Sequence, residues 1–203
     1  MPLASARLTV SCTGTPTQAA TRGGVRQLVI AWQAEDPDND RLSFKLQFRG
    51  EGEREWKLLK SSIGENSYTV DGDVLADGKY FFKVTASDLP NNPASSAREA
   101  ELVSPPVLVD NTPPLVTPGA IRRSGGKVEI DFDAADAASM LRRAEYSIDA
   151  GPWTPAEAAD GILDSLSEHL VVRLEDVTPG EHLVVIRVFD SAENAGLAKV
   201  VLR

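Results

Sequence analysis

The chain has 203 residues, of which 42% are hydrophobic and 25% are charged. This composition is that of an ordinary globular protein and excludes a collagen, a coiled coil and a disordered acidic tail, while the length suits two domains of about 100 residues. The net charge of −9, without a cluster of lysine or arginine, argues against nucleic acids and anionic lipids as partners. No apolar run approaches the about 18–20 residues that a membrane helix requires, so we expect no membrane insertion.

The amino terminus and the supply of reactive side chains restrict the chemistry further. MPLASARLTV has no basic region followed by an apolar core and is therefore not a secretory signal. The single cysteine, Cys12, excludes an internal disulfide and a multi-cysteine metal site. Cys12 lies in a run rich in threonine and serine that is either a first strand or a mobile arm, and residues 13–24 have the composition of a flexible loop.

Alternating apolar and polar residues predict that the first half is all-β. Turn-forming clusters such as DPDND, GEGE and DLPNNP separate the alternating runs. Pro105 and Pro106 cannot continue a strand ladder, so the last apolar run, VLV, is predicted to be a broken or edge strand. The predicted strands of this half cover residues 7–12, 28–34, 41–49, 67–70, 79–87 and 98–103.

The clearest domain boundary is the sequence VDNTPP, in which two prolines favour an extended, stiff connector. We predict a first domain over residues 1–110, a proline linker over 111–114 and a second domain over 115–203. Residues Pro155–Leu166 are interpreted as a long loop with room for a single helical turn, because Gly161 interrupts the helical pattern. The predicted strands of the second half cover residues 127–133, 143–149, 168–174, 182–189 and 197–202.

The two halves repeat the same features in the same order. The segment LADGKYFFKVTASD at 75–88 matches VTPGEHLVVIRVFD at 177–190: each has a turn, a glycine, a ring, alternating apolar residues and a final aspartate. AWQAED at 31–36 matches DFDAAD at 131–136, and Trp56 matches Trp153. These ordered matches predict two copies of one domain, each built around its own aromatic residue, Trp32 or Phe132.

These segments resemble the fibronectin type III and immunoglobulin-like sandwiches. The resemblance rests on Trp32 in the second strand and on the motif that leads to Tyr80, LADGKY. It implies that the Tyr80 hydroxyl folds back to the preceding corner and satisfies a backbone group. The second half has Phe132 and His182 at these positions and is therefore closer to the immunoglobulin-like type. We predict an all-β fold of two tandem antiparallel β-sandwiches, fibronectin type III-like and then immunoglobulin-like.

Motifs from nearly the whole chain are similar to the tandem sandwich tail of large bacterial proteins. They include AEDPDNDRLSF, VDNTPP, EYSIDAGPW, DGILDS and PGEHLVVIRVFDSAENAG. In many of these relatives a β-propeller precedes the tail and the protein is exported. The resemblance implies an extracytoplasmic module, periplasmic or secreted, whose partners are neighbouring domains of the same polypeptide, with another protein or a polysaccharide as further possible partners.

Acidic loops are the main concentration of reactive groups. In a sandwich of this topology, the loop after the second strand and the loop before the last strand lie at the same end, where oxygen ligands could meet a calcium ion. The alternative is that these residues cap backbone amides in turns without a metal, which is their commoner role. The candidate calcium ligands are Asp36, Asp38, Asp40, Asp88, Asp110, Asn111, Asp133, Asp136 and Asp190; no other cofactor is expected.

The remaining candidates are aromatic and imidazole side chains. Trp56 and Trp153 could stack sugar rings, but their equivalence between the halves favours a packing role that covers the core. His169 and His182 lie outside any hydrolase or metalloprotease motif, so we expect structural histidines and no active site. The predicted function is a non-catalytic spacer or protein-interaction module, and the alternative is a calcium- or carbohydrate-binding adhesive module.

Overall fold

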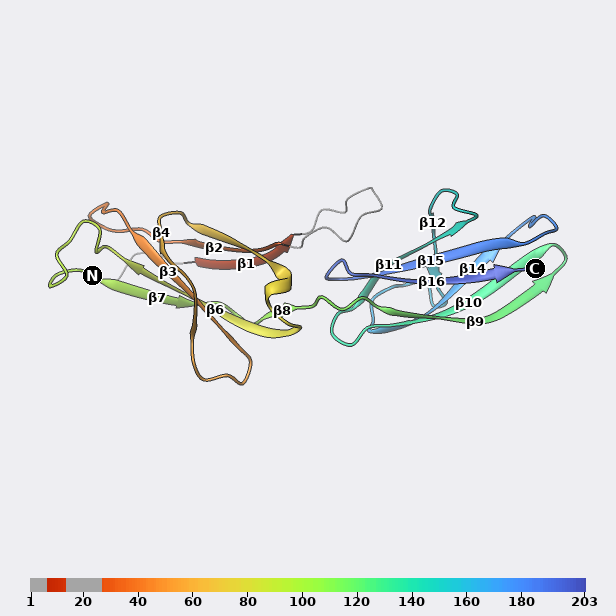
Figure 1. Ribbon diagram of the computed structural model, residues 1–203, viewed down its shortest axis with the longest axis horizontal. Coiled ribbons are helices and arrows are strands. Elements are labelled where there is room, and N and C mark those ends of the chain that lie inside the picture. Colours follow the sequence, from red (N-terminus) through yellow and green to blue (C-terminus); the bar gives the residue numbers. More distant parts are fainter. Residues whose placement is uncertain (1–6, 14–26) are drawn as a thin grey trace. The chain divides into compact units, whose positions relative to one another are not determined.

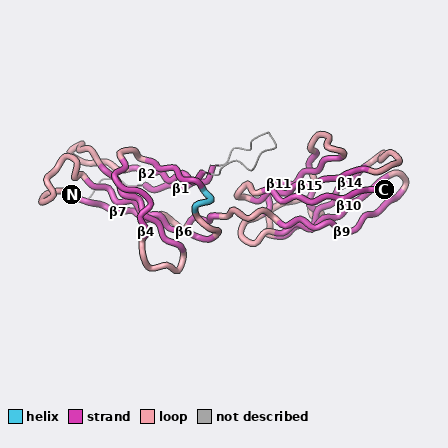
Figure 2. Tube along the Cα trace, in the orientation of Figure 1, coloured by secondary structure: helices cyan, strands magenta, loops and turns pink. Residues whose placement is uncertain are grey.

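The computed structural model describes the backbone of residues 7–13 and all atoms of residues 27–203. Contacts between residues divide the chain into two compact units, Met1–Val109 and Asp110–Arg203. Each unit is an antiparallel β-sandwich (Figures 1 and 2), and the described residues contain only one helical segment, the 3₁₀ turn η1 (Gly72–Val74). The prediction of an all-β fold with two tandem sandwiches is therefore confirmed.

The first unit packs a three-stranded sheet against a larger one. The smaller sheet has the order β1-β2-β5, and the larger has the order β4-β3-β6-β7, with β8 also paired to β6. The strands are β1 (Arg7–Thr13), β2 (Gln27–Gln33), β3 (Ser43–Gly50), β4 (Lys57–Ile63), β5 (Ser67–Asp71), β6 (Gly78–Ser87), β7 (Glu99–Val103) and β8 (Val107–Val109).

The second unit repeats this strand order in two four-stranded sheets. One sheet has the order β13-β14-β10-β9 and the other β12-β11-β15-β16, so the second strand of each unit again lies beside the first. The strands are β9 (Leu115–Ser124), β10 (Lys127–Ala135), β11 (Leu141–Ile148), β12 (Thr154–Pro155), β13 (Glu157–Ala158), β14 (Ser167–Leu174), β15 (His182–Asp190) and β16 (Ala195–Leu202).

Each unit has its own hydrophobic core, because alternate side chains of every central strand point between the two sheets. Trp32 on β2 is 4% exposed and meets the edge of Phe44 on β3 with ring centroids 5.3 Å apart. Phe132 on β10 is fully buried in the second core. The aromatic residues that the sequence pairs as equivalents therefore do have equivalent surroundings, each on the second strand of its sandwich.

The last strand of the first unit is broken as predicted. β7 pairs with Lys83–Ser87 of β6, and β8 pairs with Gly78–Tyr80 of the same strand, so the two segments follow each other along one edge. Between them, Ser104 keeps contact with Phe82: its amide donates to the Phe82 carbonyl at 2.8 Å, and its Oγ accepts from the Phe82 amide at 3.0 Å. The Ser104 hydroxyl thus gives the Phe82 amide an acceptor at the break between β7 and β8. Pro105 and Pro106 follow directly and have no N–H to offer to the ladder.

Four strands were not predicted from the sequence. β4 carries few buried side chains, and β9 contains Pro118 and Gly119, which argue against a strand. β9 is nevertheless an edge strand, where a missing N–H is tolerated, and its ladder with β10 shifts register between Ile130 and Phe132. Residues Pro155–Leu166, predicted as a long loop with room for one helical turn, are a loop over 159–166 and contain no helical turn. The segment begins with the short strands β12 and β13, and the small side chains Ala156 and Ala158 are buried in the core.

The boundary between the units lies one residue earlier than the sequence indicates. We assigned Asp110 to the first domain, but it begins the second unit because its carbonyl oxygen accepts a hydrogen bond from Asn194 Nδ2 at 3.1 Å. The segment that follows Asp110 packs directly against Gly196. A Cβ at position 196 would lie 1.9 Å from the Pro114 carbonyl oxygen, so only glycine fits there. Cys12 lies on β1, paired with Leu28, and the predicted flexible loop falls largely on residues 14–26, outside the described part of the chain.

We expect Phe132→Ala to destabilise the second unit by about 3–5 kcal/mol, since it removes a buried ring and leaves a cavity. Calorimetric unfolding of the full chain measures the change. Leu197→Ala, at a position 62% exposed in the same unit, is the matched control and should change stability by less than about 0.5 kcal/mol. Equal effects of the two substitutions would contradict the assigned core.

Candidate functional site

The acidic residues of the first unit are engaged in turns. Asp36 Oδ1 accepts hydrogen bonds from the amides of Asp38 at 2.9 Å and Asp40 at 3.3 Å. Asp40 accepts in turn from the Nδ2 groups of Asn91 and Asn92, at 3.4 and 2.7 Å, and Asp88 Oδ1 accepts from the Arg98 amide at 2.7 Å. The two loops do lie at the same end of the sandwich, but in this unit amide donors satisfy the carboxylates.

In the second unit, three of the candidate ligands come together. One carboxylate oxygen from each of Asp110, Asp136 and Asp190 can be chosen so that all lie within 4.8 Å of one another, and all three residues are buried. Asp110 precedes β9, Asp136 follows β10, and Asp190 ends β15. The group, which we call the acidic cluster, is thus built from three segments that are distant in the sequence.

Backbone geometry holds two of these carboxylates in place. Asp136 Oδ1 accepts hydrogen bonds from the amides of Ala138 and Ser139, both at 2.8 Å, which orients its second oxygen, Oδ2. Asp190 accepts from the amide of Asn194 at 2.8 Å and from its Nδ2 at 2.6 Å. Because Asn194 Nδ2 also donates to the Asp110 carbonyl, this one side chain links two members of the acidic cluster.

Burial and like charge act together on the acidic cluster. Burial raises the pKa of Asp190 above its usual value, and the charge of Asp110 adds to the rise, while hydrogen bonds from Asn194 and a polar contact with Ser139 oppose it. Two carboxylates at 4.8 Å repel each other by about 3–4 kcal/mol at an effective dielectric constant of 20. Among the described residues, no lysine, arginine or histidine forms an ion pair with Asp136 or Asp190.

The remaining candidate ligands lie outside the acidic cluster. Asn111 is half-buried and follows Asp110, whereas Asp133 points to the outer side of its sheet, where its Oδ1 lies 2.9 Å from His169 Nδ1. Asp36, Asp38, Asp40 and Asp88 belong to the other unit. Ser139, which is buried beside the cluster, could not be predicted from the sequence, because a serine in an acidic turn carries no signal of its own.

The two tryptophans lie on outer sheet faces, so the predicted role of covering the core is wrong. Neither Trp56 nor Trp153 belongs to a core cluster. The Arg187 guanidinium carbon lies 3.9 Å from the Trp153 ring centroid, and Arg49 and Lys83 lie 4.9 and 5.2 Å from that of Trp56. Cations thus occupy ring faces that a sugar would need for stacking.

The corner of each sandwich is closed by a side-chain contact to the carbonyl four residues earlier, made by different chemistry in the two units. The Tyr80 hydroxyl donates to the Ala76 carbonyl at 2.8 Å, as the resemblance implies. His182 takes this place in the second unit, with Nε2 3.0 Å from the Thr178 carbonyl oxygen and Nδ1 2.7 Å from Asp149 Oδ2. Both ring nitrogens face acceptors, so the protonated imidazolium can satisfy both. The pKa of His182 is accordingly raised, first by the hydrogen bond to Asp149.

His182 also lies 3.2 Å from the Thr178 hydroxyl, so that Asp149, His182 and Thr178 follow the order of a catalytic triad. The nitrogen that faces the hydroxyl is closer to the Thr178 carbonyl, to which it can donate only when it carries a proton. A protonated imidazole cannot accept the hydroxyl proton. The arrangement therefore fits a corner bond better than a general base.

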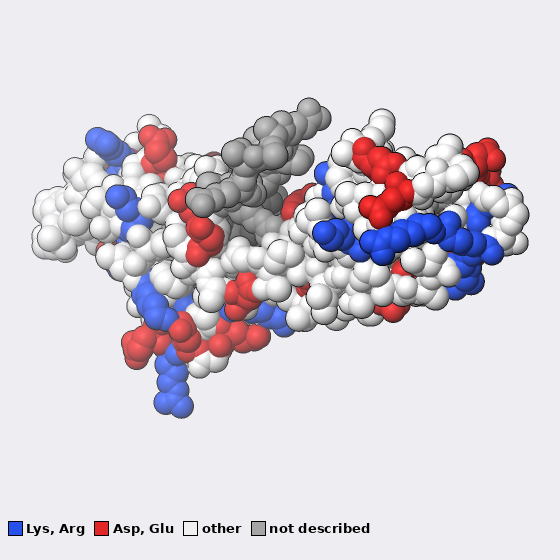
Figure 3. All heavy atoms as spheres, turned by 45° about the vertical axis from the view of Figure 1, so that its right-hand side comes forward, with Lys and Arg blue, Asp and Glu red and all other residues white. Residues whose placement is uncertain are grey.

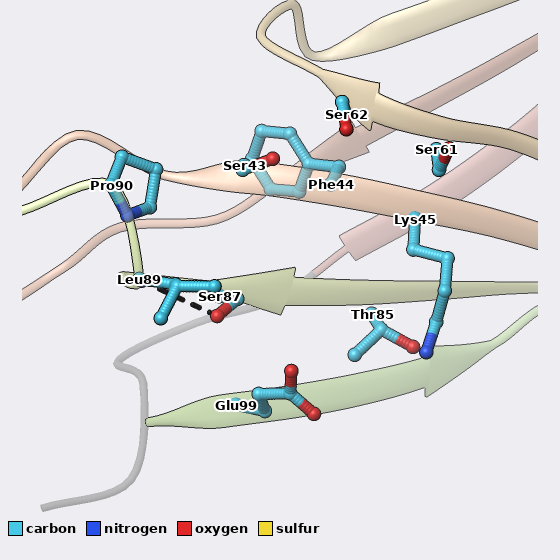
Figure 4. A pocket seen from close by; sticks show the side chains of 10 residues that line it. All are labelled: Ser43, Phe44, Lys45, Ser61, Ser62, Thr85, Ser87, Leu89, Pro90 and Glu99. Atoms are coloured by element: carbon cyan, nitrogen blue, oxygen red, sulfur yellow. Dashed lines mark hydrogen bonds between the residues drawn. The ribbon is translucent and has the colours of Figure 1, made fainter. Parts of the chain in front are cut away.

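The first unit has open grooves on its surface. One of about 320 Å³ lies beside β3, β4 and β6 and includes Lys45, Thr85 and Glu99, together with four serines (Figure 4). The Ser87 hydroxyl accepts a hydrogen bond from the Leu89 amide at 3.3 Å. No histidine or cysteine lines this groove.

No protein-family model matches the chain, and no curated protein matches it in sequence. Among solved structures, fibronectin(III)-like modules of Clostridium thermocellum CbhA are 19% identical over 96% of this chain and 92% of theirs, with a TM-score of 0.46. The FN1–FN3 domains of chicken CNTN1 are 14% identical over 96% of this chain and 66% of theirs, with a TM-score of 0.44. A two-domain fibronectin type III segment of chicken tenascin is 13% identical over 97% of each chain, with a TM-score of 0.36. Within the described part of the chain, no helix is long and apolar enough to cross a bilayer.

We expect the pair formed by His182 and Asp149 to make stability depend on pH. A raised pKa in the folded state means that His182 stabilises the fold below its unfolded pKa of about 6.5 and that this contribution is lost as pH rises through the folded pKa. Asp149, whose pKa is lowered, loses its contribution when the solution becomes acidic enough to protonate it. Urea midpoints measured from pH 5 to 9 should therefore fall towards the alkaline end.

Asp149→Asn should flatten this fall, because it removes the carboxylate that raises the pKa of His182. Asparagine tolerates the φ of 50° at this position and can still accept from the Leu183 amide, so the variant should fold. Asp160→Asn removes one charge from an exposed turn of the same unit and should keep the wild-type slope. An unchanged slope in Asp149→Asn would show that the corner pair does not titrate as described.

Proposed function

We propose that the chain is a non-catalytic structural module, a spacer or protein-interaction segment of a larger exported bacterial protein. The observation that supports this most is that each unit has a complete hydrophobic core of its own. Each sandwich can therefore be stable without a ligand or a partner domain to complete its core. The repeated sandwich architecture suits a segment that separates or presents neighbouring domains.

The surface fits the same role. Basic and acidic side chains lie close to one another over the visible face (Figure 3), which keeps a spacer soluble without a strong field of one sign. The loop that precedes the edge strand β4 is charged: Glu53 forms an ion pair with Lys57 and accepts a hydrogen bond from the Gly50 amide at 2.7 Å. Charged residues beside an edge discourage unwanted strand pairing, so contacts with other proteins would be made by selected edges and end loops.

Pulling the full chain by its two ends tests the spacer proposal. A spacer built from two self-contained sandwiches should unfold in two separate events, each lengthening the chain by roughly 30 nm at about 3.3–3.6 Å per extended residue. The Phe132→Ala variant should weaken one event and leave the other unchanged. Extension without resolved force peaks would contradict a structural role.

The absence of catalysis is tested at the triad-like corner. We expect the wild-type chain to hydrolyse an activated ester such as p-nitrophenyl acetate no faster than Thr178→Val does, because His182 Nε2 is engaged by the Thr178 carbonyl. The substitution removes the hydroxyl while keeping the side-chain volume and the carbonyl. A rate in the wild type that is ten times that of the variant would establish a nucleophile and overturn the proposal.

A further inference from the structure

The acidic cluster of Asp110, Asp136 and Asp190 contains one buried carboxylate oxygen of Asp136 that accepts no hydrogen bond from the described residues. Asp136 is 9% exposed, and its Oδ2 accepts no hydrogen bond from the described residues, although its Oδ1 accepts two. An unsatisfied buried carboxylate oxygen is costly, and most such atoms have a partner. Its position within the cluster indicates that the partner is a ligand of the cluster.

Ser139 provides a second observation, independent of the carboxylates. It is 3% exposed, and its Oγ makes no hydrogen bond of ordinary geometry with the described residues. The same hydroxyl contacts the side chain of Asp190, and the Ser139 amide donates to Asp136 Oδ1 at 2.8 Å, so the hydroxyl lies next to the cluster. The Ser139 hydroxyl and Asp136 Oδ2 are therefore two buried oxygens beside the same cluster, and neither makes a hydrogen bond of ordinary geometry with the described residues.

The ligand that fits these atoms is a hard cation. The chosen carboxylate oxygens lie within 4.8 Å of one another, and oxygens on opposite sides of a calcium ion are separated by about 4.6–5.2 Å, twice a Ca–O distance of 2.3–2.6 Å. The described members of the cluster include neither histidine nor cysteine, the ligands that favour zinc. Calcium also accepts neutral oxygens and water to complete its six to eight ligands.

We propose that Asp110, Asp136 and Asp190 bind one calcium ion, and that the ion fixes the leading segment of the second unit, residues 110–114, to the sandwich behind it. Asp110 lies on this segment, whereas Asp136 and Asp190 lie on the loops after β10 and β15. The hydrogen bond from Asn194 to the Asp110 carbonyl and the close approach of Pro114 to Gly196 already guide the segment along this surface. The ion would link the Asp110 side chain to the two loops that carry Asp136 and Asp190. This inference holds whether or not the chain acts as a spacer.

The test is thermal unfolding of the full chain in calcium, in magnesium and in chelator at neutral pH. Free calcium about a hundredfold above its Kd should raise the second unit's melting temperature by about 10 °C relative to chelator. Magnesium at the same concentration should raise it less. Titration calorimetry should give one calcium ion per chain.

Matched variants locate the effect. Asp136→Asn keeps an acceptor for the two amides but loses one ligand charge, so it should fold, melt in chelator at or above the wild-type temperature, and lose the calcium shift. Asp110→Asn, which tests the leading segment, should also lose the shift. Asp133→Asn removes the same charge from the exposed neighbour of His169 and should keep the full shift.

Hydrogen exchange provides the second readout. In the wild type, calcium should slow amide exchange in residues 110–112, 136–141 and 190–194 together, and in Asp136→Asn it should leave all three unchanged. Equal melting curves in calcium and chelator would show that protons neutralise the acidic cluster, and would overturn the proposal. A calcium shift that survives in both Asp136→Asn and Asp110→Asn would overturn it as well, since the ion would then bind elsewhere.

Discussion

Each sandwich depends on one buried ring on its second strand. Trp32 and Phe132 lie on strands that pair with the first strand on one side, and each ring faces the opposite sheet of its own unit. Burying such a ring removes a large apolar area from water and brings the two sheets into contact. Once the sheets are in contact, the strand ends have fixed positions. The loops after the second strand and before the last strand are then brought to one end.

The two units reach the same architecture with different local chemistry. At the corner, Tyr80 uses a neutral hydroxyl, whereas His182 uses an imidazole that Asp149 supports from the other side. At the loop end, the first unit surrounds Asp40 with the side-chain amides of Asn91 and Asn92, but the second unit brings three carboxylates together. The first arrangement is complete without any ligand. The second brings buried carboxylates together, and this is where we propose that a calcium ion binds.

The outer sheet faces show a different use of charge. Arg187 stacks on Trp153 and also forms an ion pair with Glu145 through a 2.6 Å contact, so an aromatic ring and a carboxylate hold the same guanidinium. Arg143 similarly lies 4.0 Å from the Phe189 ring centroid. These contacts cover apolar rings that would otherwise be open to solvent. They explain how large aromatic side chains can lie outside the two hydrophobic cores.

Much of the fold follows from the sequence alone, because period-two alternation and turn-forming clusters depend only on neighbouring residues. The strand holding Trp32, the strand holding Phe132 and the break at Pro105 were all predicted in this way. The edge strands β4 and β9 were missed because an edge strand need not alternate and can contain Pro118; tertiary pairing alone makes them strands. The same limit applies to the candidate site. Nine residues had the composition of calcium ligands, and the local sequence could not separate an aspartate that caps a turn, such as Asp36, from one that faces two others, such as Asp136. That distinction depends on the packing of the two sheets, which brings residues from three distant segments within 4.8 Å of one another.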